Sequence, residues 1–157
     1  MAGTDGLSIR VRPATGADLG ELSDLRSRAA ADLAAHRGSS ELLATVAAID
    51  DHRSGEVLHL VAEIGSVVAG EVVAVAAPGR AGGGTCRLEV LVTDPELRGV
   101  GVGHQLLVEA RTWATALGLE SIEAPALPGD RATKNFLEAH GLVAHLIVAR
   151  GPLGPPP

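Results

Sequence analysis

The sequence predicts an α/β (α+β) fold in which a mixed central sheet is flanked by helices. Three observations indicate this class: β-branched apolar runs cluster in the middle of the chain, helical spacings flank them, and neither a repeat nor an internal linker divides the elements. The elements follow the order β-α-α-β-β-β-α-β-α-β. At 157 residues the chain has the length of one domain with a substantial core, so we expect a single domain over residues 1–150 and a flexible Pro/Gly-rich tail over residues 151–157.

The first third of the chain predicts one strand and two helices. Residues 7–13 alternate apolar and polar side chains, as in a half-buried strand. Thr15 and Asp18 have the spacing of a capping box, and leucine and alanine then recur at three- and four-residue steps over residues 19–33. Residues 40–50 predict a shorter second helix, with Ser40 as its cap.

The middle of the chain predicts three consecutive strands. Residues 56–77 form two β-branched runs that meet at Gly65-Ser66, which is typical of a hairpin. Residues 78–84 are a glycine-rich loop, and residues 85–93 are a third strand-like run that ends before Asp94-Pro95.

The last third predicts two further strand–helix steps. A helix begins near Gly103 and ends at Gly118, which has the place of a C-terminal glycine cap. The remaining elements are a short strand over 121–127, a helix over 130–140 with Asp130 as its N-cap, and a final strand over 142–150.

Composition excludes several classes of protein. The hydrophobic 46% is mostly Ala, Val and Leu, and the chain has one Phe, one Trp and no Tyr, so the core is aliphatic and no phenol is present. The net charge of −6 without a basic run disfavours nucleic-acid binding and favours a cationic partner. We see no signal peptide and no apolar run long enough for a membrane span, and Cys86 is the only cysteine. We therefore expect a cytoplasmic protein that does not bind membranes.

A glycine-rich helix entrance is the strongest chemical signal. Arg98 precedes three glycines within residues 99–103, where unpaired helix N-terminal amides carry partial positive charge. Because glycine has no side chain, a phosphate could approach those amides closely. A glycine-rich turn beside a solvated arginine, without any ligand, would account for the same sequence. A Walker loop is excluded because no Lys-Ser or Lys-Thr follows, and a dinucleotide fingerprint fails because His104 stands at its third glycine position.

The segment LVTDPELRGVGVGHQLL, residues 91–107, resembles motif A of the GNAT superfamily of acyl-CoA-dependent N-acyltransferases. The strand, the following proline and the pattern R-x-x-G-x-G all agree. Residues 130–142 resemble the family's motif B, and the element order agrees over residues 7–150. The resemblance implies a mixed, mostly antiparallel sheet and acetyl-CoA as co-substrate, with no metal.

The resemblance also implies which residues contact the cofactor. The turn and first helical residues would bind the CoA diphosphate, and the strand end would present main-chain groups to the pantetheine arm, because this strand splays from the next one. Asp130 stands where the family often has Asn, and Lys134 would reach the phosphates. The implied cofactor-binding residues are Leu91, Val92, Thr93, Arg98, Gly99, Val100, Gly101, Val102, Gly103, His104, Asp130 and Lys134.

For catalysis the resemblance implies direct attack of a primary amine, on a small molecule or a protein, upon the thioester in a ternary complex. Leu137 stands where many members have a Tyr that protonates the departing thiolate. Glu123 is the first candidate for the general base and Glu89 the second, while a solvated carboxylate or an arginine partner is the simpler role for either. The missing acid leaves open a catalytically weak or inactive acyl-CoA-binding sensor, and a nucleotide-binding domain is a third reading.

Two further expectations concern metals and self-association. The six histidines show no metal-ligand spacing, so structural or surface roles are expected for them. The final strand, 142–150, could pair with another subunit and form a homodimer, although no other interface signal is present.

Overall fold

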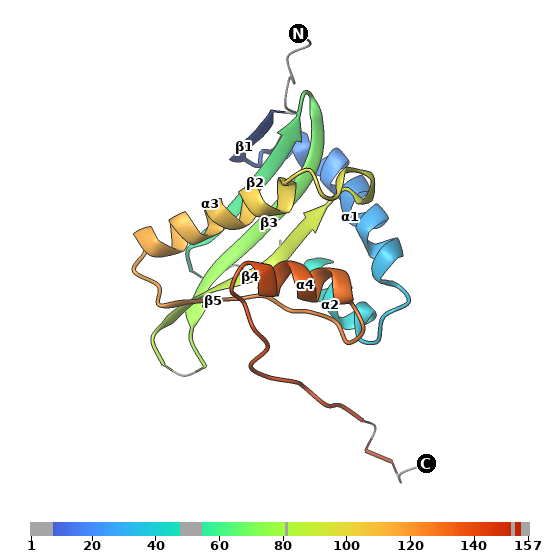
Figure 1. The fold of residues 1–157 in the computed structure, drawn as a ribbon, viewed down its shortest axis with the longest axis vertical. Helices are drawn as coiled ribbons and strands as arrows, with labels where there is room; N and C mark the ends of the chain where they lie inside the picture. Colours follow the sequence, from blue (N-terminus) through green and yellow to red (C-terminus); the bar gives the residue numbers. More distant parts are fainter. Residues whose placement is uncertain (1–7, 48–54, 81, 152, 155–157) are drawn as a thin grey trace.

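A five-stranded sheet in the order β1-β2-β3-β4-β5 forms the centre of the protein (Figure 1). The computed structural model describes residues 8–47, 55–80, 82–151 and 153–154. The first four strands pair antiparallel, whereas β5 runs parallel to β4. The strands are β1 (Ile9–Pro13), β2 (Val57–Ile64), β3 (Val67–Pro78), β4 (Gly84–Thr93) and β5 (Ser121–Glu123). The predicted mixed, mostly antiparallel sheet is confirmed, and Gly65 makes the predicted hairpin turn with a φ of +64°.

Helices cover both faces of the sheet, with α3 on one face and α1 on the other (Figure 1). The helices are α1 (Leu19–Leu33), α2 (Ser39–Ala47), α3 (Val102–Ala116) and α4 (Arg131–Ala139), with single 3-10 turns at Gly16–Asp18 and Pro95–Leu97. Among the described residues, no helix has both the length and the apolarity needed to cross a membrane.

Most of the predicted helix ends are confirmed. Thr15 and Asp18 form the capping box, and the Asp130 carboxylate accepts a hydrogen bond from the Thr133 amide at 3.0 Å. Gly118, with a φ of +71°, ends α3 in a Schellman motif. The Ser40 cap is wrong: α2 begins at Ser39, so Ser40 lies inside the first turn.

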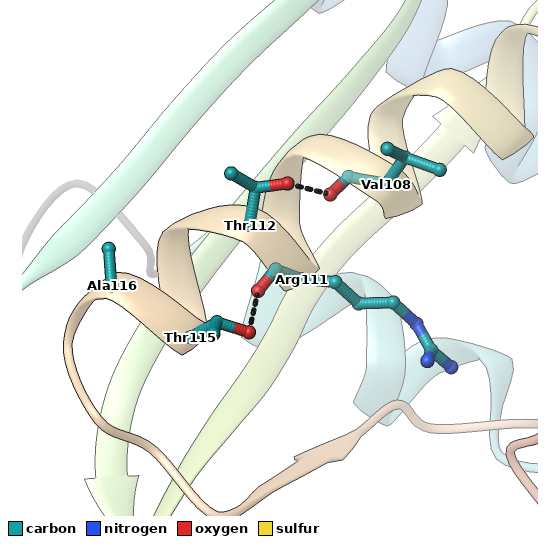
Figure 2. A pocket seen from close by; sticks show the side chains of 5 residues that line it. All are labelled: Val108, Arg111, Thr112, Thr115 and Ala116. Atoms are coloured by element: carbon teal, nitrogen blue, oxygen red, sulfur yellow. Dashed lines mark hydrogen bonds between the residues drawn. The ribbon is translucent and has the colours of Figure 1, made fainter.

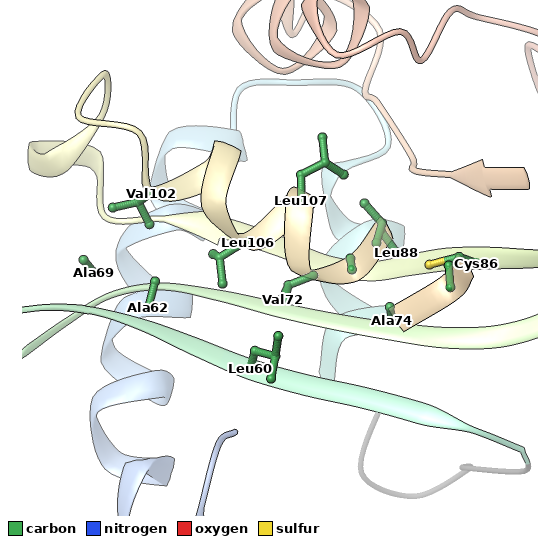
Figure 3. Packing of buried hydrophobic residues seen from close by; sticks show 12 residues of the cluster. Leu60, Ala62, Ala69, Val72, Ala74, Cys86, Leu88, Val102, Leu106 and Leu107 are labelled. Carbon is green, nitrogen blue, oxygen red and sulfur yellow. The ribbon is translucent and has the colours of Figure 1, made fainter. Parts of the chain in front are cut away.

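The core is aliphatic, as predicted. Buried side chains of β2, β3 and β4, including Val72 and Leu88, pack against Leu106 and Leu107 on the inner face of α3 (Figure 3). A smaller cluster, built on Leu22 and Leu25, packs α1 on the opposite face.

The single tryptophan and the single cysteine of the chain both pack on the α3 side of the sheet. Trp113 is partly buried there, and Cys86 is fully buried, which raises the pKa of its thiol to about 11.

A β-bulge interrupts β4 at Glu89. Val73 of β3 pairs with Val90 and Ala74 pairs with Leu88, so Glu89 is the extra residue. The bulge reverses the alternation of β4, because Leu88 and Leu91 both pack on the α3 side while Val92 packs on the α1 side. No local sequence signal predicted it.

Two predicted strands differ from the structure. Residues 142–150 form no strand; nearly all of them are exposed, and Arg150 instead pairs with Glu41 of α2. Alternation alone does not supply a hydrogen-bonding neighbour, and β5 offers an edge of only three residues. The strand predicted over 121–127 stops at Glu123, because Pro125 and Pro128 lack the amide protons needed to continue the ladder.

Some predicted boundaries lie outside the described residues. These are Leu7 of the first strand, residues 48–50 of the second helix and most of the tail after Gly151.

Candidate active site

A cleft of about 790 Å³ lies between the α1–α2 pair and the C-terminal half of β4. Its other walls are the glycine-rich turn before α3, the segment 124–127 after β5, and α4. This volume suits a ligand of drug or cofactor size, and most of the lining is aliphatic.

The three glycines of the turn have two different structural reasons. Gly99 and Gly101 adopt φ values of +81° and +99°, a left-handed conformation that L-residues with a side chain rarely adopt. Gly101 is the N-cap of α3, and no atom lies within 4 Å of a Cβ placed on Gly99, so open space adjoins this backbone. At Gly103 a Cβ would lie 3.3 Å from ring carbons of Phe136, so this glycine lets α4 pack closely on α3.

Two ion pairs connect the turn to α1. Arg98 Nη2 lies 2.7 Å from Asp32 Oδ2, and both residues line the cleft. Arg28 Nη2 donates to Asp94 Oδ2 at 2.8 Å. Hydrogen bonding from the Glu96 amide, and then the Arg28 guanidinium, holds the pKa of Asp94 below its usual range despite burial. The turn therefore has a fixed position relative to α1.

The β4 and β5 strands separate as the resemblance implied. Their parallel pairing covers only Thr85–Arg87 with Ser121–Glu123. Within the part of the chain that the structure describes, residues 88–93 have no strand partner on that side. Leu91, Val92 and Thr93 all line the cleft at this opening.

The structure separates the two candidate bases. Glu89, the bulge residue, lines the cleft; its side chain is 18% exposed and lies 4.0 Å from Arg87. Glu123 is not among the lining residues and forms ion pairs with Arg87 at 3.0 Å and Arg80 at 3.8 Å. The sequence ranked Glu123 first, but the arrangement favours Glu89.

Some of the predicted residues around motif B line the cleft, and others do not. Asp130 and Leu137 line the cleft and are almost fully buried, but the Asp130 carboxylate is occupied by the helix cap. Lys134 lies outside the lining and pairs with Glu138 at 2.7 Å. Val100, of the turn, is also outside the lining, and its side chain is exposed. The remaining turn residues, from Arg98 to His104, line the cleft.

Sequence reasoning missed a buried charge cluster beside the cleft. Arg26 of α1 lines the cleft and donates through Nε to Glu71 Oε2 at 2.8 Å. Glu71 is fully buried, and His59 Nε2 lies 2.7 Å from its Oε1. Burial acts to raise the pKa of Glu71, but hydrogen bonds and charge from His59 and Arg26 together hold it below the usual range. A glutamate in an apolar strand was the available signal.

A second depression, on the outer face of α3, is not a comparable site (Figure 2). All of its lining residues come from one helix, and its two threonine hydroxyls donate to carbonyls one turn earlier, from Thr112 to Val108 and from Thr115 to Arg111. Among the described residues, no group of His, Cys, Asp or Glu side chains is arranged to hold a metal ion.

Comparison with known proteins agrees with this geometry. Residues 23–142 match the model of the acetyltransferase (GNAT) family. No curated protein matches the chain at a significant level of sequence similarity.

Solved structures share the fold at low identity. An acetyltransferase from Trypanosoma brucei is 22% identical, with a TM-score of 0.66, 93% of this chain covered and 100% of that one. A transcriptional regulator from Bacillus halodurans C-125 is 20% identical, with a TM-score of 0.68 and the same coverage. AAC(6')-Iy, solved with a bisubstrate analogue, CoA-S-monomethyl-acetylneamine, is 17% identical, with a TM-score of 0.66 and coverage of 92% and 99%.

Proposed function

The chain belongs to the acetyltransferase (GNAT) family, and on that premise we propose that it transfers an acetyl group from acetyl-CoA to a primary amine by direct attack in a ternary complex. The acceptor is a small molecule or a protein amino group. Acetyl-CoA supplies the activated thioester, and the chain's own residues supply binding, orientation and proton transfer.

One observation carries this proposal: the left-handed Gly99 and Gly101 and the N-terminus of α3 lie in the same cleft as the separated end of β4. Main-chain amides of residues 99–104 would hold the CoA diphosphate, with Arg98 as a nearby cation. Leu91, Val92 and Thr93 would bind the pantetheine arm, and a main-chain amide there would polarise the thioester carbonyl. Lys134 would join this set only by leaving Glu138.

Glu89 is the proposed general base. Glu89 lines the cleft beside the separated strand end, where its carboxylate would take a proton from the substrate's ammonium group, and the neutral amine that results would attack the thioester. Glu123 is the second candidate and would first have to leave two arginines. Holding amine and thioester side by side would supply much of the rate through proximity.

The departing thiolate has no phenol beside it in this proposal. Leu137 is 6% exposed in the cleft wall, and the chain contains no tyrosine. General acid catalysis contributes roughly 10²- to 10⁴-fold, so its loss would slow transfer without abolishing it. The same observation favours a second candidate function, an acyl-CoA-binding sensor with little or no turnover.

Calorimetric titration with acetyl-CoA, followed by thiol release over a panel of amines, tests both candidates. We expect saturable binding that Gly101→Glu abolishes, because a carboxylate would occupy the anion site. Gly82→Glu is the matched control, since Gly82 also has a positive φ, of +92°, but is not among the residues that line the cleft.

Three outcomes are distinguishable. Binding with thiol release supports the enzyme, and binding without release on any amine supports the sensor. A flat titration of the wild-type protein, or normal binding by Gly101→Glu, would refute the proposed cradle.

A further inference from the structure

Two histidine rings are in contact at the edge of the cleft. His104 lies in the first turn of α3 and lines the cleft, and its Nδ1 lies 3.0 Å from Nε2 of His140, which follows α4. The His140 Nδ1 lies 2.7 Å from the carbonyl oxygen of Phe136, and the Phe136 ring contacts the His140 ring at a tilt of 39°, with centroids 4.3 Å apart. Neither histidine has a role in the proposed catalytic steps.

This chain of contacts fixes where protons lie. A carbonyl oxygen only accepts, so Nδ1 of His140 carries a proton. In the neutral pair, Nε2 of His140 is therefore bare and accepts from Nδ1–H of His104. The remaining ring nitrogen, Nε2 of His104, is then bare as well. A bare nitrogen at the edge of an anion-binding cleft repels the anion instead of donating to it.

One added proton turns Nε2 of His104 from an acceptor, which repels an anion, into a donor. The proton either makes His104 an imidazolium, or it resides on His140 while His104 changes tautomer. In both microstates Nε2 of His104 becomes an N–H donor and the pair carries one positive charge.

The charged groups around the pair already have partners. Arg111 of α3 donates from its Nη2 to the main-chain oxygen of His140. On α4, Lys134 is paired with Glu138, and in the turn before α3, Arg98, the nearby cation of the proposed diphosphate site, is paired with Asp32. The Asp130 carboxylate is engaged in the helix cap.

We propose that the His104–His140 pair takes up one proton from solvent when the diphosphate of CoA binds, and that Nε2–H of His104 donates to that diphosphate. This inference rests on the proposed function, because it takes the glycine-rich turn as the diphosphate site. His140 acts as a positioning residue that holds the His104 ring through the Phe136 carbonyl. The consequence is that CoA affinity falls as pH rises, by up to about tenfold per pH unit.

The test is calorimetric titration of the full chain with CoA in two buffers of different ionisation enthalpy, Tris and HEPES, near pH 7.5, where histidine titration is measurable. The dependence of the heat on the buffer gives the number of protons taken up. Dephospho-CoA is the second probe, because it keeps the diphosphate but lacks the 3′-phosphate, which titrates itself near pH 6. We expect an uptake approaching one proton for both ligands.

Variants assign the proton to the pair. His104→Gln should abolish the proton uptake and weaken CoA binding several-fold. His140→Gln should reduce the proton uptake, because the ring of His104 loses its fixed neighbour. His145→Gln, at an exposed histidine of the segment 142–150, should leave the uptake at the wild-type value. Thermal melts of each variant confirm that it is folded.

The outcomes separate this inference from the proposed function. Saturable CoA binding without proton uptake, or an uptake unchanged in His104→Gln, overturns the inference while leaving the cradle in place. An uptake seen with CoA but not with dephospho-CoA overturns the assignment to the diphosphate. No binding of either ligand refutes the proposed function itself.

Discussion

Replacing Gly70 with alanine tests how the sheet positions the turn before α3. A Cβ on Gly70 would lie 2.5 Å from Val102 Cγ1 and 3.0 Å from both Leu106 Cδ1 and the Val92 oxygen. Val102 is the first residue of α3 and is 1% exposed, so it has no room to move away. The added methyl must displace the N-terminus of α3 from β3.

Overpacking of this kind costs about 1 to 3 kcal/mol. For a chain of this length each kcal/mol lowers Tm by about 2 to 4 °C, so we expect Gly70→Ala to lower Tm by about 2 to 12 °C. Differential scanning calorimetry measures this change. The displaced helix also carries the turn, so acetyl-CoA affinity measured by titration should fall in parallel.

Gly20→Ala is the matched control, because Gly20 is exposed in α1 and no atom lies within 4 Å of its added Cβ. Alanine there should stabilise the protein by up to about 1 kcal/mol. In the Val102→Ala background, which removes the nearest methyl, Gly70→Ala should cost less by about 0.5 to 3 kcal/mol. Equal Tm values for Gly70→Ala and Gly20→Ala would refute this account of the packing.

Three other experiments test separate features. Leu137→Tyr should raise kcat if a thiolate leaves without an acid at present, and an unchanged kcat would show that protonation does not limit turnover. Glu89→Gln should lower kcat/KM by at least about tenfold at neutral pH, while Glu123→Gln should change it little; the reverse order would exchange their roles. Glu71 is buried, but its hydrogen bonds to His59 and Arg26 hold its pKa low, so wild-type stability should fall with pH below the unfolded glutamate value of about 4.3. Urea melts at several pH values should show that Glu71→Gln costs about 3 kcal/mol at neutral pH and flattens this acid dependence.

Features with local signals were predictable from the sequence. Thr15, Gly118 and Asp130 each act on atoms within a few residues, so their roles as caps follow from spacing alone. The glycine-rich turn was found for the same reason. Its third glycine has a tertiary cause, contact with Phe136, which the motif does not reveal.

Features that depend on distant neighbours were not predictable. The close approach at Gly70 and the salt bridge between Arg26 and Glu71 each join elements far apart in sequence. Of the two candidate bases, Glu89 lies at the bulge and lines the cleft, whereas Glu123 does not line it and pairs with two arginines. The strand predicted over 142–150 does not form, because an alternating pattern describes one strand and does not show whether a neighbouring strand is available to pair with it.

The extra residue in β4 also restricts how this protein can change in length. Deleting one residue at position 89 would straighten the strand and turn every later side chain to the opposite side. Leu91 would then face α1, and Val92 would face α3. A surface loop tolerates gain or loss of a residue, whereas a single deletion at position 89 would exchange the side chains that the C-terminal end of β4 presents to the two faces of the sheet.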